Sequence, residues 1–301
     1  MDPLRSELFA LTAALLWAIS ASLLEKLAHR ISPRELNIFK GSIAIVLLLV
    51  TSLLMGEDLK GLNAHVVGML LLSGVIGIGL GDTAYFYGLK DIGSRRALLL
   101  FALAPPMTAL IGWMFLGETL PLLSWIGIFI TVGGVAWVVT ERNPQEENKQ
   151  DKKVLTRGIV LGTLASLGQA IGLVLSRSVM TTEGVSSLQS AALRLIAGVI
   201  FIIIWKIVIK EKYGDWMRNG EAKKTWGLLF VAAFIGTYLC LWLQQMAIQG
   251  APAGIIQTLL STTPIFILPI SAMQGEKITW RSVIGAVISI VGVMMVFGLV
   301  G

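Results

Sequence analysis

Long apolar runs separated by short polar connections make up most of the 301-residue chain. A helix that crosses a bilayer core about 30 Å thick needs about 20 mostly apolar residues. The pattern therefore predicts an all-α integral membrane protein with ten transmembrane helices. Their expected ranges are 8–25, 36–55, 66–89, 95–116, 121–140, 158–180, 187–209, 226–248, 253–274 and 279–299.

A polar connection in the middle of the chain divides the ten predicted helices into five and five. It reads "ERNPQEENKQDKKVLTR" and spans 141–157. We therefore expect a first five-helix repeat at 1–140, a polar linker at 141–157 and a second five-helix repeat at 158–301. The first apolar run is expected to be a mature helix rather than a cleaved signal peptide, because acidic residues flank it.

The two halves of the chain resemble each other. A shift of 158 aligns 104–139 with 262–297 without a gap, and it gives eleven identities in 36 positions. Self-similarity of this kind indicates internal duplication. Five crossings leave the chain on the opposite side of the membrane, so the second repeat is predicted to be inverted relative to the first. Inverted repeats are common in secondary transporters.

Composition agrees with a membrane protein and argues against other classes. Of all residues 55% are hydrophobic and 14% charged, whereas a soluble domain is about a quarter charged. The net charge of +6 comes from basic residues scattered between apolar runs, so nucleic acid is not an expected partner. The sequence has no metal-spaced His/Cys cluster, phosphate loop or nucleophile elbow. We therefore expect neither an enzyme nor a bound cofactor.

Two long motifs recur at equivalent places in the halves. The first half reads "LAPPMTALIGWMFLGETL" followed by "GIFITVGGVAWVV", and the second reads "STTPIFILPISAMQGEKI" followed by "GAVISIVGVMMVF". These motifs, together with ten helices in two repeats, resemble the EamA-type proteins of the drug/metabolite transporter superfamily. The resemblance implies ten helices around a central cavity that moves small metabolites such as amino acids across the inner membrane, frequently outward.

Lysine and arginine are unevenly distributed between the two sets of loops. The connections after the first, third, fifth, seventh and ninth predicted helices, together with the helix ends that border them, hold about 19 of them, and the N-terminus with the other connections and their bordering helix ends holds about three. The positive-inside rule then places the 141–157 linker in the cytoplasm and both termini outside. Members of the superfamily are commonly drawn with cytoplasmic termini, so this orientation departs from that picture. The expected location is a bacterial or archaeal inner (plasma) membrane, and the protein is expected to be a monomer or a homodimer.

Three ionisable side chains lie inside predicted transmembrane helices, where an unpaired charge is costly. Lys40 is in the second helix, Asp82 in the third and Arg194 in the seventh. A shift of 154 superposes Lys40 on Arg194, whereas Asp82 has no acidic counterpart. At about 1.5 Å per residue, Lys40 and Asp82 are expected at similar depths below one surface, so an ion pair between their helices is feasible.

Two interpretations of these charges remain open. In the first, Lys40 and Asp82 form a structural salt bridge, or Lys40 extends to the nearby interface. In the second, Asp82 is a protonatable coupling group, or Arg194 and Lys40 bind an anionic group of the substrate. Burial of a carboxylate favours proton coupling, whereas a close cation opposes it.

Aromatic and amide side chains inside the predicted helices form a second set of candidates. Amides in hydrocarbon are costly without partners, so we expect them to face a cavity or a neighbouring helix. A cavity lined by aromatic faces and a few polar groups suits a small molecule, and helix packing is the alternative for each residue. The set comprises Trp17, Tyr85, Tyr87, Gln169, Trp242, Gln244, Gln245, Gln257 and Thr262.

Prolines lie in the middle of two equivalent predicted helices. Pro105, Pro106 and Pro264 each lack a backbone donor and are expected to bend their helices. The bend would expose carbonyls to the cavity, or serve as a gating hinge or a packing kink. Glu118 and Glu276 occupy the turns that enter the fifth and tenth helices, and they are expected to cap those helices.

The sequence as a whole predicts a secondary transporter that works by alternating access. Its substrate is expected to be a small amino-acid-like or similarly polar metabolite, with export as the expected direction and the lipid bilayer as its surroundings. Proton coupling through Asp82 is the one cofactor-like role left open. The alternatives are a flippase of a lipid-linked carrier on the same fold, and a membrane scaffold that transports nothing.

Overall fold

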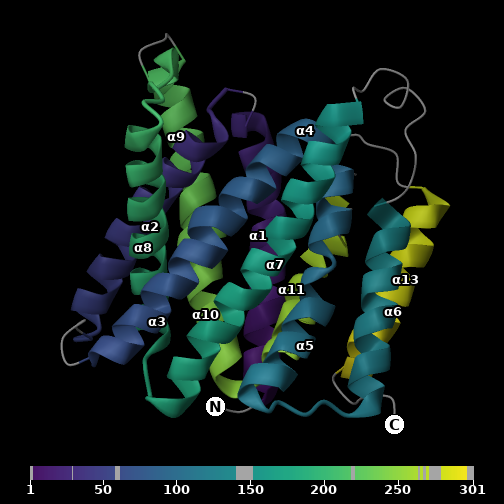
Figure 1. Ribbon diagram of the computed structural model, residues 1–301. Coiled ribbons are helices and arrows are strands. Elements are labelled where there is room, and N and C mark those ends of the chain that lie inside the picture. The colour runs from purple at the N-terminus through teal and green to yellow at the C-terminus, as the bar shows by residue number, and fades with distance from the viewer. Residues whose placement is uncertain are drawn as a thin grey trace.

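The computed structural model describes residues 3–28, 30–57, 62–139, 152–217, 221–263, 265–266, 269–270 and 279–296. Throughout this part of the chain the regular structure is helical, and the helices form a bundle of elongated rods (Figure 1). Six helical segments are long and apolar enough to cross a membrane: Leu4–Ala28, Pro33–Leu54, Ala64–Ile92, Lys152–Thr182, Ser187–Val208 and Ala222–Gly250. They correspond to six of the ten predicted helices, and the full number stays a prediction.

The first half begins with two apolar helices and a sharp turn between them. In that turn the Ser32 hydroxyl accepts a hydrogen bond from the Glu35 backbone nitrogen, and Pro33 occupies the first helical turn, as is typical of a helix start. A continuous helix with a π-helical middle follows. The elements are α1 (Pro3–Ala28), α2 (Pro33–Leu54), α3 (Ala64–Gly74), η1 (Val75–Asp82), α4 (Thr83–Phe101), α5 (Ala104–Leu116) and α6 (Leu122–Val139).

The second half repeats this order of elements. It contains α7 (Lys152–Thr182), α8 (Ser187–Val208), the short η2 (Asp215–Met217), α9 (Ala222–Ala233), η3 (Phe234–Leu239), α10 (Cys240–Gly250), α11 (Ala253–Leu260) and α13 (Trp280–Val296). A shift of 157 carries η1 onto 232–239, which contains the π-helical η3. The polar linker expected at 141–157 is shorter than predicted, because α7 already begins at Lys152; residues 141–151 lie outside the described residues.

Corresponding helices of the two halves pack against each other in antiparallel pairs. In α2 and α8, Gly41 lies against Val199, and Arg34 lies over the ring of Trp205. The residue numbers therefore rise along one helix as they fall along the other. Contacts between the halves also recur in pairs, because α1 packs against α10 and η3 as α7 packs against α4 and η1.

The two ends of the bundle collect different connections. In Figure 1, α1 begins and α13 ends at the lower end, whereas α6 ends and α7 begins at the upper end. Ion pairs at the upper end join the α1–α2 turn to the start of α9 (Arg30 with Glu221) and α4 to α7 (Asp91 with Arg157). The basic connections after the first, third, fifth and seventh predicted helices thus meet at one end.

The prolines of the first half start a helix instead of bending one. The helix breaks at Ala102–Leu103, and Pro105 and Pro106 occupy the first turn of α5. The prediction of one bent helix over 95–116 was wrong. The backbone N–H groups in the first turn of a helix have no intrahelical acceptor, so prolines fit there without bending the helix. At this break the Leu100 carbonyl accepts a hydrogen bond from the Leu103 backbone nitrogen at 3.0 Å and another from the Ser166 hydroxyl of α7 at 2.7 Å. Pro264 lies outside the described residues.

Small residues let α6 and α13 approach each other closely at the right of the bundle (Figure 1). A Cβ atom added at Gly134 would lie 2.4 Å from the Ser289 hydroxyl and 2.7 Å from the Gly285 carbonyl oxygen. At the neighbouring Gly133 an added Cβ atom would meet nothing within 4 Å. This contact is the glycine-mediated packing that membrane helices favour.

We predict that Gly134→Leu lowers the melting temperature of the purified protein, whereas Gly133→Leu leaves it nearly unchanged. Overpacking of a close contact costs about 1–3 kcal/mol, and both variants gain the same helix propensity. Thermal unfolding in detergent, followed by light scattering and size-exclusion chromatography, measures the difference. Equal losses in the two variants would contradict the α6–α13 contact.

Candidate functional site

Lys40 and Asp82 form an ion pair between α2 and the end of η1. The Lys40 ammonium lies 2.8 Å from Oδ2 of Asp82, and it also lies 5.1 Å from the centre of the Phe86 ring. The Lys40 side chain is 6% exposed and that of Asp82 20% exposed. The structure thus confirms that the two charges meet, as their predicted depths allow.

Arg194 approaches the same place from α8. It is 1% exposed and is the largest fully buried side chain among the described residues. Its Nη2 atom would lie 3.5 Å from a Cβ atom added at Gly77 of η1, and Asp82 is the acid that interacts with it electrostatically. We call Lys40, Asp82 and Arg194 the central charge cluster. The two cations that the repeat relates therefore flank the one acid that has no counterpart.

The π-helical stretch η1 positions Asp82 at its last residue. A π-helix changes the backbone hydrogen-bond pattern, and such segments are frequent at functional sites. The Asn37 side chain, one turn before Lys40 on α2, donates to the Ile78 carbonyl at 3.1 Å and to the Thr83 hydroxyl at 3.2 Å. Asn37 thus joins α2 to η1 beside the Lys40–Asp82 pair.

Backbone-to-backbone packing holds η1 against α7. A Cβ atom added at Gly172 would lie 3.0 Å from the Gly77 Cα atom, and the Ser73 hydroxyl donates to the Gly172 carbonyl. On the other side, a Cβ atom at Gly74 would lie 2.0 Å from the Arg194 carbonyl oxygen. No side chain fits between these backbones, so the α3–η1 segment packs directly on α7 and α8.

A buried contact between a serine and a glutamine extends the set of polar groups along α8. The Ser190 hydroxyl donates to Oε1 of Gln245 at 2.8 Å, and both residues are fully buried. Ser190 lies one turn before Arg194 and therefore on the same face of α8. Nε2 of Gln245, Oε1 of Gln257 and Oδ1 of Asn37 are buried without a hydrogen-bond partner among the described residues.

The remaining predicted site residues are spread along the bundle. Gln169 and Gln244 are buried, Trp17 packs against the core around α1 and α10, and Trp242 lies beside Tyr238. Tyr85 packs edge-on against Phe86 and Phe101. Thr262 is buried, but it lies in the turn after α11, where its hydroxyl donates to the Leu259 carbonyl near the end of that helix. That these residues line a cavity stays a prediction.

Tyr87 belongs to a different cluster, at the upper end of the bundle. The Arg34 guanidinium lies between the rings of Tyr87 and Trp205, 5.1 and 4.6 Å from their centres, and it pairs with Glu211. This end carries charged groups that the sequence analysis did not single out. These groups lie at helix ends, where charged residues are common, so their positions in the sequence do not indicate a buried cluster.

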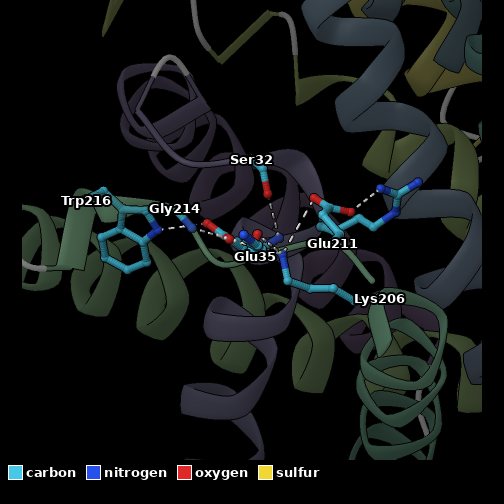
Figure 2. A network of polar contacts seen from close by, with 8 residues as sticks. Ser32, Glu35, Lys206, Glu211, Gly214 and Trp216 are labelled. Carbon is cyan, nitrogen blue, oxygen red and sulfur yellow. Dashed lines mark hydrogen bonds and ion pairs between the residues drawn. The ribbon is translucent and has the colours of Figure 1, made fainter. Parts of the chain in front are cut away.

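The carboxylate of Glu35 organises these groups into what we call the Glu35 network (Figure 2). Glu35 accepts hydrogen bonds from the Gly214 backbone nitrogen and the Trp216 indole, each at 2.8 Å, and from the Lys206 ammonium at 3.1 Å. Both Glu35 and Lys206 are buried. The network fastens the connection between α8 and α9 onto the start of α2.

At the lower end, Glu118 has a role other than the one expected. It does not cap the helix that follows it; its Oε2 accepts a hydrogen bond from the backbone nitrogen of Ala253, at the start of α11, and it pairs with Arg177 of α7. Arg177 also donates to the Ile248 carbonyl. Glu118 therefore ties together segments of both halves. Glu276, its predicted equivalent, lies outside the described residues.

We predict that Lys40→Met destabilises the protein more than the double variant Lys40→Met/Asp82→Asn. Removal of one partner leaves an uncompensated buried charge, which costs about 3–5 kcal/mol, whereas removal of both charges is often nearly neutral. Melting temperatures of the two variants in detergent measure this difference. A double variant that is less stable than the single one would show that the two side chains act independently.

Comparisons with known proteins point in one direction. A family model described as the EamA-like transporter family matches residues 4–140 and 156–298. The chain is 24% identical over 261 residues to YyaM of Bacillus subtilis (strain 168), described as an uncharacterized transporter, and the match covers 86% of this chain and 82% of YyaM. A shorter match, 28% identical over 72 residues, covers 24% of this chain and 92% of the permease-like protein YdzE of the same organism.

A solved crystal structure shares the fold. It has a TM-score of 0.80 and 16% sequence identity, and the match covers 98% of this chain and 96% of that one. The resemblance inferred from the recurring motifs is confirmed, because the family model matches nearly the whole chain. Together with the apolar helices, it identifies a multi-pass membrane protein of a transporter class. The chain belongs to the EamA-like transporter family.

Proposed function

We propose that this protein is a secondary transporter that moves a small polar metabolite across the inner membrane by alternating access. In this proposal ten transmembrane helices form two inverted five-helix repeats. The observation that carries it is the central charge cluster, which lies where η1 and corresponding helices of the two halves, α2 and α8, meet. Transporters built from inverted repeats bind substrate at the repeat interface.

The antiparallel pairing of corresponding helices supports inversion. A duplication related by an axis along the membrane normal would make corresponding helices parallel, whereas an axis in the membrane plane makes them antiparallel. The pairs Gly41 with Val199 and Thr131 with Gly292 both lie in antiparallel contacts. The location of the basic connections at one end of the bundle supports a cytoplasmic linker and external termini.

The nature of the buried polar groups supports an amino-acid-like substrate. The centre of the described bundle offers a guanidinium, an ammonium, a carboxylate and several amides. Groups of this kind are costly inside a bilayer-spanning bundle unless they serve a ligand or one another. We propose export as the direction of transport, because the family that this chain resembles frequently moves its substrates outward.

The Lys40–Asp82 pair supports a structural role for Asp82 over proton coupling. At 2.8 Å the carboxylate has the Lys40 ammonium as its direct partner, so the pair satisfies both charges inside the bundle. We therefore propose that Asp82 mainly neutralises Lys40. Proton coupling would require the pair to open during the transport cycle.

The first test is exchange in reconstituted liposomes. We expect unlabelled amino acids inside the vesicles to drive uptake of radiolabelled amino acids from outside, because an alternating-access carrier exchanges substrate across the membrane. Empty liposomes and liposomes that contain heat-denatured protein are the controls. Absence of exchange with amino acids and with any other metabolite pool, together with movement of a lipid-linked carrier, would favour the flippase instead.

The second test compares wild type with Asp82→Asn between about pH 5.5 and pH 8. We expect transport by the variant to be lower at every pH with a profile of unchanged shape, because the substitution leaves Lys40 without its partner. The initial rate of exchange is the measurement, and Asp91→Asn at the upper end is the matched control. A pH dependence that disappears in Asp82→Asn alone would show that Asp82 carries the proton.

A further inference from the structure

Arg194 has donors that no group of the described protein uses. Its Nε and Nη1 atoms are both buried and have no hydrogen-bond partner among the described residues. An arginine side chain holds its donors in a rigid planar fork, which suits carboxylate and phosphate groups. A buried guanidinium without a partner is costly, and a ligand is a partner that would satisfy these donors.

The charges of the cluster leave an excess at this arginine. Asp82 is the one acid of the cluster, and its carboxylate is engaged by Lys40 at 2.8 Å. Within the part of the chain that the structure describes, no acid lies in ion-pair contact with Arg194. Two cations and one acid thus leave one positive charge, which a monoanion would neutralise.

The surroundings of Arg194 provide a further donor. A Cβ atom added at Gly77 would lie 3.5 Å from Nη2 of Arg194, so Nη2 lies against η1, and Nε and Nη1 are the buried donors left for a ligand. One turn away on α8, the Ser190 hydroxyl donates to Oε1 of Gln245. Nε2 of Gln245 is buried without a hydrogen-bond partner among the described residues. One turn is about 5.4 Å along the helix axis, which is within the reach of a small ligand.

We propose that Arg194 binds the carboxylate of the transported metabolite and that Nε2 of Gln245 adds a donor to the same ligand. This inference rests on the proposed transport function and names its substrate class, a small organic monocarboxylate. An amino acid and a simple organic acid both present this group. Oδ1 of Asn37, whose side chain lies against η1, is a buried acceptor without a partner among the described residues, and it favours the amino acid, whose ammonium needs acceptors.

The wild-type protein tests the inference without any substitution. Purified protein in detergent is titrated with common amino acids, with short monocarboxylates, and with the primary amide of each compound, and the melting temperature is recorded. We expect carboxylates to raise the melting temperature, because a ligand that binds only the folded state stabilises it, and we expect the matching amides to have no effect. Stabilisation by an amide equal to that by its carboxylate would overturn the inference.

Variants assign the binding to Arg194. In exchange assays we expect Arg194→Gln to lower carboxylate transport by about tenfold to a hundredfold, because a charge-assisted hydrogen bond is lost. Arg194→Lys keeps the charge but loses the planar fork, so a smaller loss is expected. Arg30→Gln, which removes an exposed guanidinium whose partner Glu221 is also exposed at the upper end, is the control and should leave transport unchanged. Size-exclusion chromatography establishes that each variant is folded.

The outcomes separate this inference from the proposed function. Exchange of metabolites that lack a carboxylate, if it persists in Arg194→Gln, would leave a transporter and overturn the carboxylate assignment. Full carboxylate transport by Arg194→Lys and Arg194→Gln would do the same. Absence of exchange for every compound in the wild type, with carboxylates still raising its melting temperature, would overturn transport and keep the binding site. Stabilisation by amino acids but not by simple acids would identify an amino acid as the source of the carboxylate.

Discussion

A charge inside a membrane-spanning bundle has to find its partner within the protein, because lipid offers none. The Lys40–Asp82 pair meets this constraint, and the helices around it are arranged accordingly. Glycines bring η1 to backbone contact with α7 and α8, and Asn37 joins α2 to η1. The same close packing brings Arg194 to η1, where it has no ion-pair partner among the residues that the structure describes.

The repeated cations and the unrepeated acid have different roles in the central charge cluster. Lys40 and Arg194 occupy equivalent positions of the two halves, on helices that pack antiparallel. Asp82 occurs in one half only, so one cation is neutralised within the protein and the other is not. Of the duplicated pair of cations, Lys40 is in an ion pair, and Arg194 has buried donors without a partner among the described residues, which we propose serve a ligand. The family assignment describes the class of this protein, whereas this difference is a property of its own residues.

The two ends of the bundle are closed by unlike contacts. At one end the Glu35 network fastens the α8–α9 connection to α2 with a buried acid and a buried lysine (Figure 2). At the other end Glu118 joins α7 and the start of α11. Alternating access would require each end to open in turn. Charged contacts that bridge the halves would then break and re-form, or move together with the segments that they join.

The sequence by itself determined the helical membrane class, the two similar halves, the family and the three buried charges, because apolar run length, residue spacing and the cost of charge in lipid are local properties. It also indicated that Lys40 and Asp82 could meet. Only the tertiary structure decided that Pro105 and Pro106 start a helix and that Glu118 caps a distant one. It likewise placed Tyr87 beside Arg34 and left Arg194 without a partner among the described residues. These outcomes depend on hydrogen bonds and ion pairs between segments far apart in the chain, and the local sequence pattern does not indicate such contacts.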